Sequence, residues 1–162
     1  MRRIAILASL GSLLLMMPVG YLSLLSWFSR RPAELGVTDG KLAGRQPSKP
    51  NWVSSFAASD THRMAPLHVT SKSPGDTLDR LEQLILAMPG ARVVTRSDRY
   101  LHAEFRSRLF RFVDDAEFLV SPDGATVQFT SAARSGHSDF GVNRQRIEHL
   151  QQALSASSTA GG

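Results

Sequence analysis

The sequence predicts an α+β protein in which an N-terminal transmembrane helix precedes a two-layer domain, an antiparallel sheet with two helices on one face. Three observations support this fold class. A long uncharged apolar run lies near the N-terminus, two segments repeat apolar residues at helical spacing, and four segments between them alternate apolar and polar residues. The expected order within the domain is therefore β-α-β-β-β-β-α.

Composition limits the classes of function. A chain of 162 residues with 42% hydrophobic content suits one ordinary domain with an appendage. Because the sequence contains no cysteine, it excludes disulfides, cysteine-ligated metals and thiol catalysis. The net charge of +5 comes from arginines and lysines scattered among acids, which argues against nucleic acid as a partner.

The first element is the uncharged run from Ile4 to Phe28. As a helix rising about 1.5 Å per residue it spans roughly 37 Å, enough to cross a hydrocarbon core of about 30 Å. Tyr21 and Trp27 lie toward its far end, and aromatic side chains favour the membrane interface. We expect residues 1–29 to be an uncleaved anchor, since the run exceeds a usual signal peptide and lacks a small-residue cleavage site.

The charges that flank this run give opposing indications of orientation. Arg2 and Arg3 favour a cytoplasmic N-terminus, whereas Arg30 and Arg31 on the other flank favour the reverse. The start of the chain is similar to an export signal, and we give this similarity more weight. We therefore expect a single-pass protein of the inner (cytoplasmic) membrane with an extracytoplasmic C-terminal domain.

Residues 30–59 are rich in proline, glycine and serine, and Pro32, Pro47 and Pro50 exclude a continuous helix. This composition predicts a linker between the anchor and a domain at residues 60–154. Apolar residues such as Leu42 recur along it, so two interpretations stay open: a solvated tether, or a segment that packs partly on the domain. Residues 155–162 are small and polar, and we expect a disordered tail.

The domain is expected to begin with a short strand from Met64 to Val69 and a helix from Ser73. Serine is a favoured N-cap residue, Pro74 and Asp76 suit the first turn, and Pro89-Gly90 ends the helix. Apolar residues at three- and four-residue steps form its expected core face, namely Leu78, Leu81, Leu84, Ile85 and Met88.

Four strands and a second helix follow. Turn residues separate the strands, which are expected from Ala91 to Arg96, Tyr100 to Arg106, Phe110 to Val120 and Thr126 to Ala133. Strands this close in sequence pair antiparallel as a meander. The helix is expected from the N-cap Asp139 to Leu154, and its apolar side consists of Val142, Ile147, Leu150 and Leu154.

Alternation assigns the strand side chains to two faces. The face toward the helices is expected to contain Leu101, Ala103, Phe105, Phe110, Phe112, Phe118, Val127, Phe129 and Ser131. The other face is expected to be polar and open, and it contains His102, Glu104, Arg106, Arg111, Asp115, Glu117, Gln128, Thr130 and Arg134. Asp114 shares the parity of Phe118, so we expect it to point toward the helices.

The first candidates for a site are three acids on one strand, Asp114, Asp115 and Glu117. Asp115 and Glu117 share a face, and together they could hold a hard cation or act in acid–base catalysis. We favour a ladder of cross-strand ion pairs with the arginines of that face. For Asp114 we favour a structural hydrogen bond to backbone N–H groups or to an arginine such as Arg144.

Other candidates lie nearby. His102 is on the polar face, but no histidine spacing typical of a metal site occurs, and we expect neither a metal nor a cofactor. The serines around His137 lack the elbow of a nucleophilic hydrolase. The candidate binding residues are Asp114, Asp115, Glu117, His102, Arg134, Asp139, Asn143 and Arg144.

Several short motifs in this order resemble the domain of unknown function 1499 family. They are Arg31-Pro32, Leu35-Gly36-Val37, Asp39-Gly40, Pro47, Pro50-Asn51, Val53-Ser54-Ser55, Tyr100 to Phe105, Phe110 to Phe118 and Asp139 to Arg144. The resemblance covers about residues 31–154. It implies an exported or membrane-attached domain of bacteria and plastids, without an established activity.

The sequence departs from this family pattern at several positions. Gln46 and Trp52 stand where the family usually has a cysteine pair, so a thiol or disulfide role is absent. Thr130, Ala133 and His137 replace an arginine, a serine and a tyrosine that the resemblance leads us to expect. If those positions form an active site in other members, this chain lacks part of it.

Two functions follow from these observations. The first is a membrane-anchored cell-envelope protein, held through Ile4 to Phe28, whose domain binds an unidentified envelope protein or small ligand. The alternative is an envelope hydrolase that uses Asp114, Asp115 or Glu117 with His102, with or without a divalent metal. The sequence names no reaction.

Overall fold

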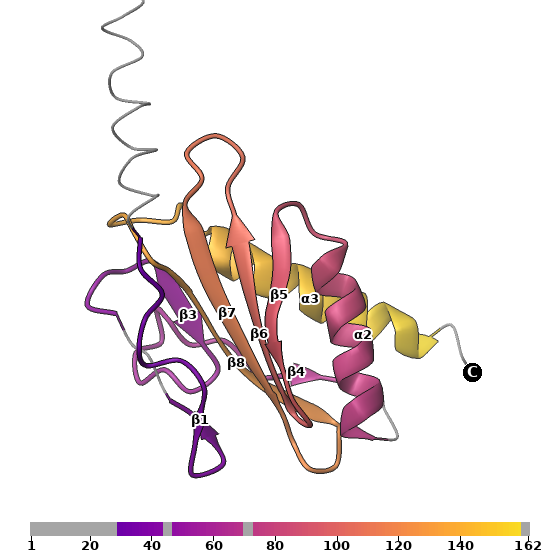
Figure 1. Ribbon diagram of the computed structural model, residues 1–162. Coiled ribbons are helices and arrows are strands. Elements are labelled where there is room, and N and C mark those ends of the chain that lie inside the picture. Colours follow the sequence, from indigo (N-terminus) through magenta and orange to yellow (C-terminus); the bar gives the residue numbers. More distant parts are fainter. Residues whose placement is uncertain (1–28, 44–46, 70–72, 160–162) are drawn as a thin grey trace, which may run out of the picture.

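The computed structural model describes residues 29–43, 47–69 and 73–159, and it shows an α+β fold with a mostly antiparallel sheet and two helices (Figure 1). The transmembrane helix predicted for residues 4–28 lies outside these ranges. Among the residues described, no helix is both long and apolar enough to cross a membrane.

The predicted meander is confirmed. Its strands are β5 (Ala91–Arg96), β6 (Tyr100–Arg106), β7 (Val113–Val120) and β8 (Thr126–Ala133), and each pairs antiparallel with the next. Two shorter strands, β3 (Trp52–Ser54) and β4 (Leu67–His68), both pair with β8 and complete the sheet. A separate ribbon consists of β1 (Val37–Thr38) and β2 (Lys41–Leu42).

The start of β7 differs from the prediction, because the strand begins at Val113 and not at Phe110. Arg111 has a φ of 56°, a left-handed conformation that cannot continue a strand. Ser107 closes the loop, since its N–H donates to the carbonyl of Phe112 over 2.9 Å and its hydroxyl accepts from the N–H of Phe112 over 2.9 Å. Phe110 and Phe112 therefore lie in a loop and not on the inner face of the sheet.

The first strands also differ from the prediction. The strand expected over Met64 to Val69 shortens to β4, because only two residue pairs join it to the start of β8. Strand β3 was not predicted, since it is very short and lies among residues that predict turns. It pairs with the far end of β8, where Trp52 faces Ala132.

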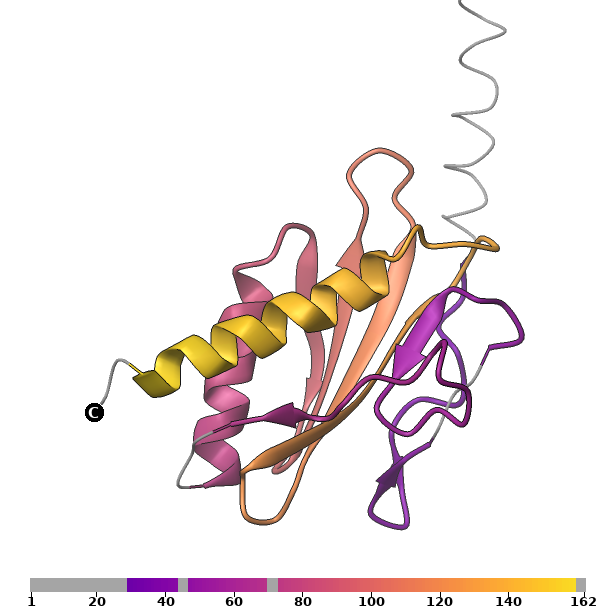
Figure 2. The same cartoon turned by 180° about the vertical axis from the view of Figure 1, so that it is seen from behind.

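Helices α2 (Pro74–Leu86) and α3 (Val142–Thr159) cover one face of the sheet (Figure 2). As predicted, Ser73 is the N-cap of α2, because its hydroxyl accepts from the N–H of Asp76 over 3.2 Å. Both helices pack on the inward strand residues, and their buried apolar side chains are Leu78, Leu81, Ile85, Ile147, Leu150 and Leu154. The prediction for Val142 is wrong: Val142 is exposed, and the fully buried Asn143 takes the inward position of the first turn.

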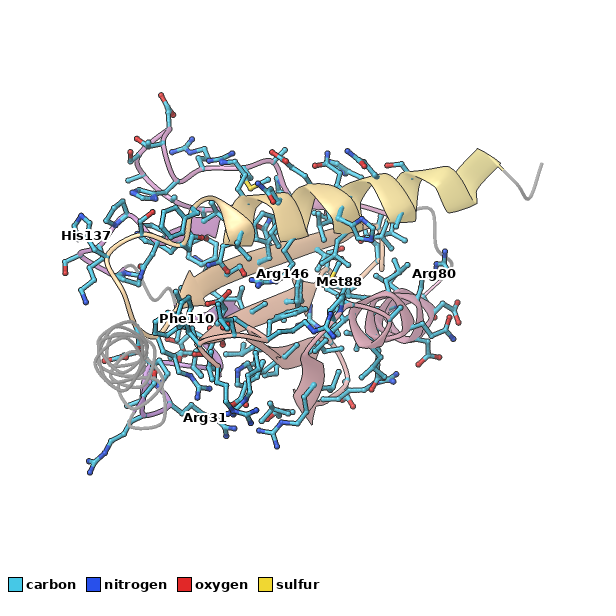
Figure 3. All side chains as sticks on the ribbon, turned by 90° about the horizontal axis from the view of Figure 1, so that it is seen from above. Arg31, Arg80, Met88, Phe110, His137 and Arg146 are labelled. Atoms are coloured by element: carbon cyan, nitrogen blue, oxygen red, sulfur yellow. The ribbon has the colours of Figure 1, made fainter. Side chains whose placement is uncertain are left out.

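The second face of the sheet is covered as well. Residues 29–43 lie across it, on the opposite side from α3, and Figure 3 shows Arg31 and Arg146 on these two sides. Leu42 packs there against Tyr100 and Leu119. The expectation of an open polar face is therefore wrong, since Asp115 is 2% exposed and Glu117 is 1% exposed.

Candidate functional site

Two carboxylates lie opposite each other on the covered face. Asp115 of β7 pairs in register with Glu104 of β6, an arrangement that is repulsive unless a cation lies between the two side chains. Arg134 supplies this cation from the end of β8. Its guanidinium contacts Glu104 Oε1 at 2.6 Å and Asp115 Oδ1 at 2.7 Å, and its Nε contacts Asp115 Oδ2 at 2.8 Å. The cross-strand ion pairs expected of Arg134 are therefore present.

Glu104 is the centre of this ionic cluster. Besides Arg134, it accepts from Arg31 over 2.8 Å and from Arg92 over 2.7 Å. Burial alone would raise the pKa of Glu104, but the hydrogen bonds from Arg92, Arg31 and Arg134 together lower this pKa to about 2. Glu104 thus stays ionised and joins residues 29–43 to the sheet.

His102 contacts Asp115 on the same face, with 2.8 Å between Nε2 and Oδ1. Burial alone would raise the pKa of Asp115, yet the bonds from Arg134 and His102 hold it below its usual value. Because an ionised carboxylate only accepts, His102 Nε2 carries the proton of this bond. Both side chains are almost completely buried, so this pair is closed to a substrate in the conformation described.

Glu117 is buried with neutral donors. Its Oε1 accepts from the N–H of Gly36 over 2.6 Å and from the hydroxyl of Tyr100 over 2.8 Å. No cationic side chain in the described parts of the chain forms an ion pair with it. Burial raises the pKa of Glu117, and burial together with the bond to Glu117 raises the pKa of Tyr100. Glu117 therefore holds residues 29–43 in place, although removing its charge from water costs free energy.

These contacts decide what the covered acids can do. The oxygens of Glu104 and Asp115 accept from arginine and histidine donors, and both side chains are removed from solvent. Within the described residues, no three histidine, aspartate or glutamate side chains are grouped as a metal site. The arrangement is suited to fastening the N-terminal segment and unsuited to binding a substrate.

The acid on the helix side has a different partner from the one expected. Asp114 accepts from Arg146 over 2.8 Å, and the same guanidinium lies 4.0 Å from the ring centre of Phe105. Arg144 instead donates to the carbonyl of Thr61 over 2.8 Å. Two helical residues turn the side chain by roughly 200°, so Arg144 and Arg146 point in opposite directions. Burial raises the pKa of Asp114 despite the charge of Arg146.

Asp139 and Asn143 connect the start of α3 to the sheet. Helix α3 begins at Val142 and not at the expected Asp139, because Phe140 and Gly141 have positive φ angles. The Asp139 side chain still caps the helix, since it accepts from the N–H of Asn143 over 3.0 Å. Burial alone would raise the pKa of Asp139, but its bonds from Asn143 and Gly141 lower it. The Asn143 amide accepts from Ser131 over 2.6 Å and donates to Asp139 over 2.9 Å. These candidate residues therefore have structural contacts separate from the covered acids.

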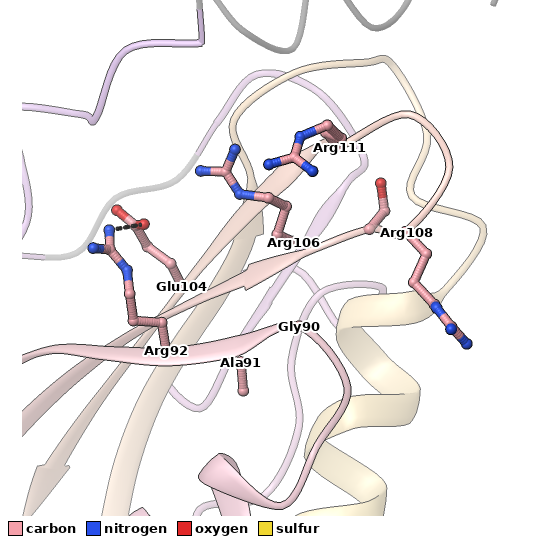
Figure 4. A pocket seen from close by; sticks show the side chains of 8 residues that line it. Gly90, Ala91, Arg92, Glu104, Arg106, Arg108 and Arg111 are labelled. Atoms are coloured by element: carbon pink, nitrogen blue, oxygen red, sulfur yellow. Dashed lines mark hydrogen bonds and ion pairs between the residues drawn. The ribbon is translucent and has the colours of Figure 1, made fainter.

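One end of the sheet carries an arginine pocket of about 320 Å³, which Figure 4 shows from close by. Its lining comes from the turn before β5, the start of β5, the end of β6 and the following loop, and consists of Gly90, Ala91, Arg92, Glu104, Arg106, Ser107, Arg108 and Arg111. Neither Arg106 nor Arg108 makes a side-chain hydrogen bond or ion pair with another described residue. The Arg106 guanidinium lies beside that of Arg111 and is available to a ligand, whereas the Arg108 side chain points away from both (Figure 4).

Sequence reasoning missed this pocket. It placed Arg106 and Arg111 in a cross-strand ladder and gave no role to Arg92 or Arg108. The detectable signal is the run from Arg106 to Arg111, which contains three arginines and two apolar residues. If the whole run had been predicted as a loop, its three arginines would have been placed together at one end of the sheet.

A second pocket, of about 420 Å³, lies beside the β1–β2 ribbon. Leu42, Phe56 and Leu119 supply its apolar lining, and Lys41 and Gln128 supply polar groups. It contains none of the candidate residues. Its position separates it from the arginine pocket.

Comparison with known proteins supports the resemblance drawn from the motifs. No curated protein matches the sequence. A family model described as "Protein of unknown function (DUF1499)" matches residues 44–154. Because this match covers more than half of the chain and includes β3 to α3, the protein belongs to the DUF1499 family.

Proposed function

We propose that the protein is a membrane-anchored binding protein of the cell envelope. Residues 4–28 are the proposed anchor, and the domain lies outside the cytoplasm. The proposed binding site is the arginine pocket, where the domain takes a small ligand or part of an envelope protein. The activity is binding, without a chemical step.

One observation carries this proposal: the availability of polar groups differs between the two sites. On the covered face, the acids accept hydrogen bonds from other described residues. In the arginine pocket, Arg106 and Arg108 have donors without a partner among the described residues. A binding site needs accessible polar groups, so the pocket satisfies this condition and the acids do not.

The position of the pocket agrees with an anchor at residues 4–28. Ser29 is the first described residue, and its hydroxyl accepts from Ser135 over 3.0 Å. Figures 1 and 2 show the start of residues 29–43, the β6–β7 loop and the turn before β5 at the same end of the molecule. An anchor that ends at Phe28 would therefore place this end toward the membrane.

The alternative of an envelope hydrolase finds less support. The contact of His102 with Asp115 is a pairing that hydrolases use, but such a base must reach a substrate or a nucleophile. Here both side chains are buried, and Arg134 occupies the other oxygen of Asp115. Glu117 is also covered, by Gly36 and Tyr100.

The proposal is tested with the full chain in its native membranes. We expect it to resist carbonate extraction, and we expect a C-terminal topology reporter to be active outside the cytoplasm. Leu14→Arg, which adds a charge to the centre of the proposed anchor, should release the protein, since arginine there costs about 2.5–3.5 kcal/mol on insertion scales. A wild-type protein recovered in the soluble fraction, or a cytoplasmic reporter, contradicts the proposal.

Binding is tested by purifying the chain from these membranes and identifying what accompanies it. The comparison uses Arg106→Gln/Arg108→Gln and a control that removes the same charge elsewhere, Arg30→Gln/Lys49→Gln. We expect the wild type and the control to retain the same molecules and the pocket variant to lose them. Identical recovery from all three proteins would show that the pocket is not the binding site.

A further inference from the structure

We propose that the arginine pocket binds a phosphate dianion, carried by a lipid headgroup or by a soluble phosphate monoester. This inference rests on the proposed function, because it names the ligand class of the same pocket. Guanidinium groups match phosphate oxygens in geometry and charge, and several of them around one cavity favour a doubly charged group. A volume of about 320 Å³ admits a phosphate with a small substituent.

The charge around the pocket is positive despite the acid in its wall. Glu104 is neutralised by its bonds to Arg31, Arg92 and Arg134. In this cluster three arginines face two carboxylates, Glu104 and Asp115, so one positive charge remains. Arg106 adds a second, and Arg111 and Arg108 also line the pocket, although the Arg108 side chain points away from the other arginines (Figure 4). Glu104 therefore does not repel an anion and holds Arg92 at the rim.

The backbone around the pocket is fixed before any ligand arrives. Gly90 lies so close to β6 that an added Cβ would be 2.2 Å from the carbonyl oxygen of Arg106, and its own carbonyl accepts from the N–H of Arg106 over 2.9 Å. The loop that follows is closed by the bonds between Ser107 and Phe112. Arg111 has a left-handed backbone, a strained conformation that often occurs at binding sites. A preorganised site loses less entropy on binding.

A lipid source is compatible with the surroundings of the pocket. Leu109 lies between two pocket residues in sequence and is 67% exposed. An exposed apolar side chain beside arginines suits the boundary between headgroups and acyl chains. This loop lies at the same end of the molecule as the start of the described N-terminal segment (Figures 1 and 2). A headgroup phosphate would thus be within reach of the pocket.

The test uses the full chain in nanodiscs of phosphatidylcholine, titrated with inorganic phosphate in a calorimeter. We expect saturable binding by the wild type, and binding at least tenfold weaker for Arg106→Gln/Arg108→Gln. Arg30→Gln/Lys49→Gln should bind as the wild type does. Arg106→Gln alone provides a second variant and should also bind more weakly than the wild type. All variants should keep the wild-type melting temperature, because the replaced side chains make no hydrogen bond or ion pair with another described residue. Equal affinity of the pocket and control variants would overturn the proposal.

Four further titrations determine the ligand class and its source. Acetate, a monoanion, should bind at least tenfold more weakly than phosphate, and equal binding would contradict a dianion site. In nanodiscs that contain phosphatidic acid, a lipid phosphate monoester, a lipid source predicts loss of the phosphate signal, whereas phosphatidylserine should leave it intact. If phosphatidic acid does not compete and glycerol phosphate does, the ligand is soluble.

The two proposals can fail separately. If the chain is anchored and the pocket variant loses its accompanying molecules but phosphate does not bind, only the phosphate assignment fails. If carbonate releases the protein from membranes while phosphate still binds, the anchor fails and the ligand class stands.

Discussion

The replacement Asp115→Ala tests whether the covered acids hold the fold together. It removes the acceptor of two bonds from Arg134, at 2.8 and 2.7 Å, and of one from His102, at 2.8 Å. Removing one partner of a buried ion pair typically costs about 3–5 kcal/mol. Because Arg134 still pairs with Glu104 in this variant, we expect a loss at the lower end of that range, about 3 kcal/mol. This loss is a large part of a typical unfolding free energy of about 5–15 kcal/mol.

The assay is urea unfolding of the full chain in mild detergent, followed by circular dichroism. Asp79→Ala is a matched control, because Asp79 pairs with Arg96 at the surface and its side chain is 60% exposed. Exposed pairs contribute about 0–1 kcal/mol, so this variant should unfold almost as the wild type does. Equal losses in the two variants would refute the structural role of Asp115. Loss of an enzymatic activity by a fully stable Asp115→Ala protein would instead support the hydrolase.

Three other predictions concern the charges on the two faces of the sheet. Glu117→Gln should become increasingly stable relative to the wild type as pH rises from 4 to 7 in urea titrations. The raised pKa of Glu117 makes the contribution of this residue to wild-type stability greatest at low pH, and glutamine keeps the acceptor for Gly36 and Tyr100. The reverse trend would contradict its burial as a costly carboxylate. Glu104→Gln should destabilise the domain at neutral pH. Its difference in unfolding free energy from the wild type should vanish as pH falls from about 4.5 to about 2, because protonation of Glu104 removes the stability that its low pKa provides. A difference that does not change over this range would show that the arginines do not hold Glu104 ionised. Arg146→Ala should lower the free energy of unfolding by about 3 kcal/mol, because it leaves Asp114 unpaired, whereas Arg144→Ala should lower it by about 1 kcal/mol or less. Similar melting temperatures for these two variants would refute the assignment of Arg146 as the partner of Asp114.

Local patterns predicted the parts of the fold that depend on neighbouring residues. Ser73 and the apolar spacing of α2 give the helix start and its buried face, and alternation gives the meander and the inward position of Asp114. These features follow from hydrogen bonding and side-chain direction within short segments.

Contacts between residues far apart in the sequence determine the features that local patterns did not predict. Alternation placed Asp115 and Glu117 on one face, but it could not show that residues 29–43 cover that face, since Gly36 and Glu117 are far apart in sequence. The choice of Arg146 over Arg144 for Asp114 depends on the rotation of α3 against the sheet. The arginine pocket was missed because Phe110 to Phe112 were predicted as the start of a strand, whereas the left-handed Arg111 extends the turn at Arg108 into a loop.

A nuclear magnetic resonance titration of the isotopically labelled full chain in nanodiscs with inorganic phosphate would locate the ligand. If the ligand binds at the arginine pocket while the covered acids hold the structure, the largest amide shift changes occur at Gly90, Arg106 and Arg108, with little change at Asp115 and Glu117. Largest changes at Asp115 and Glu117, or no saturable change at the pocket, would contradict this assignment.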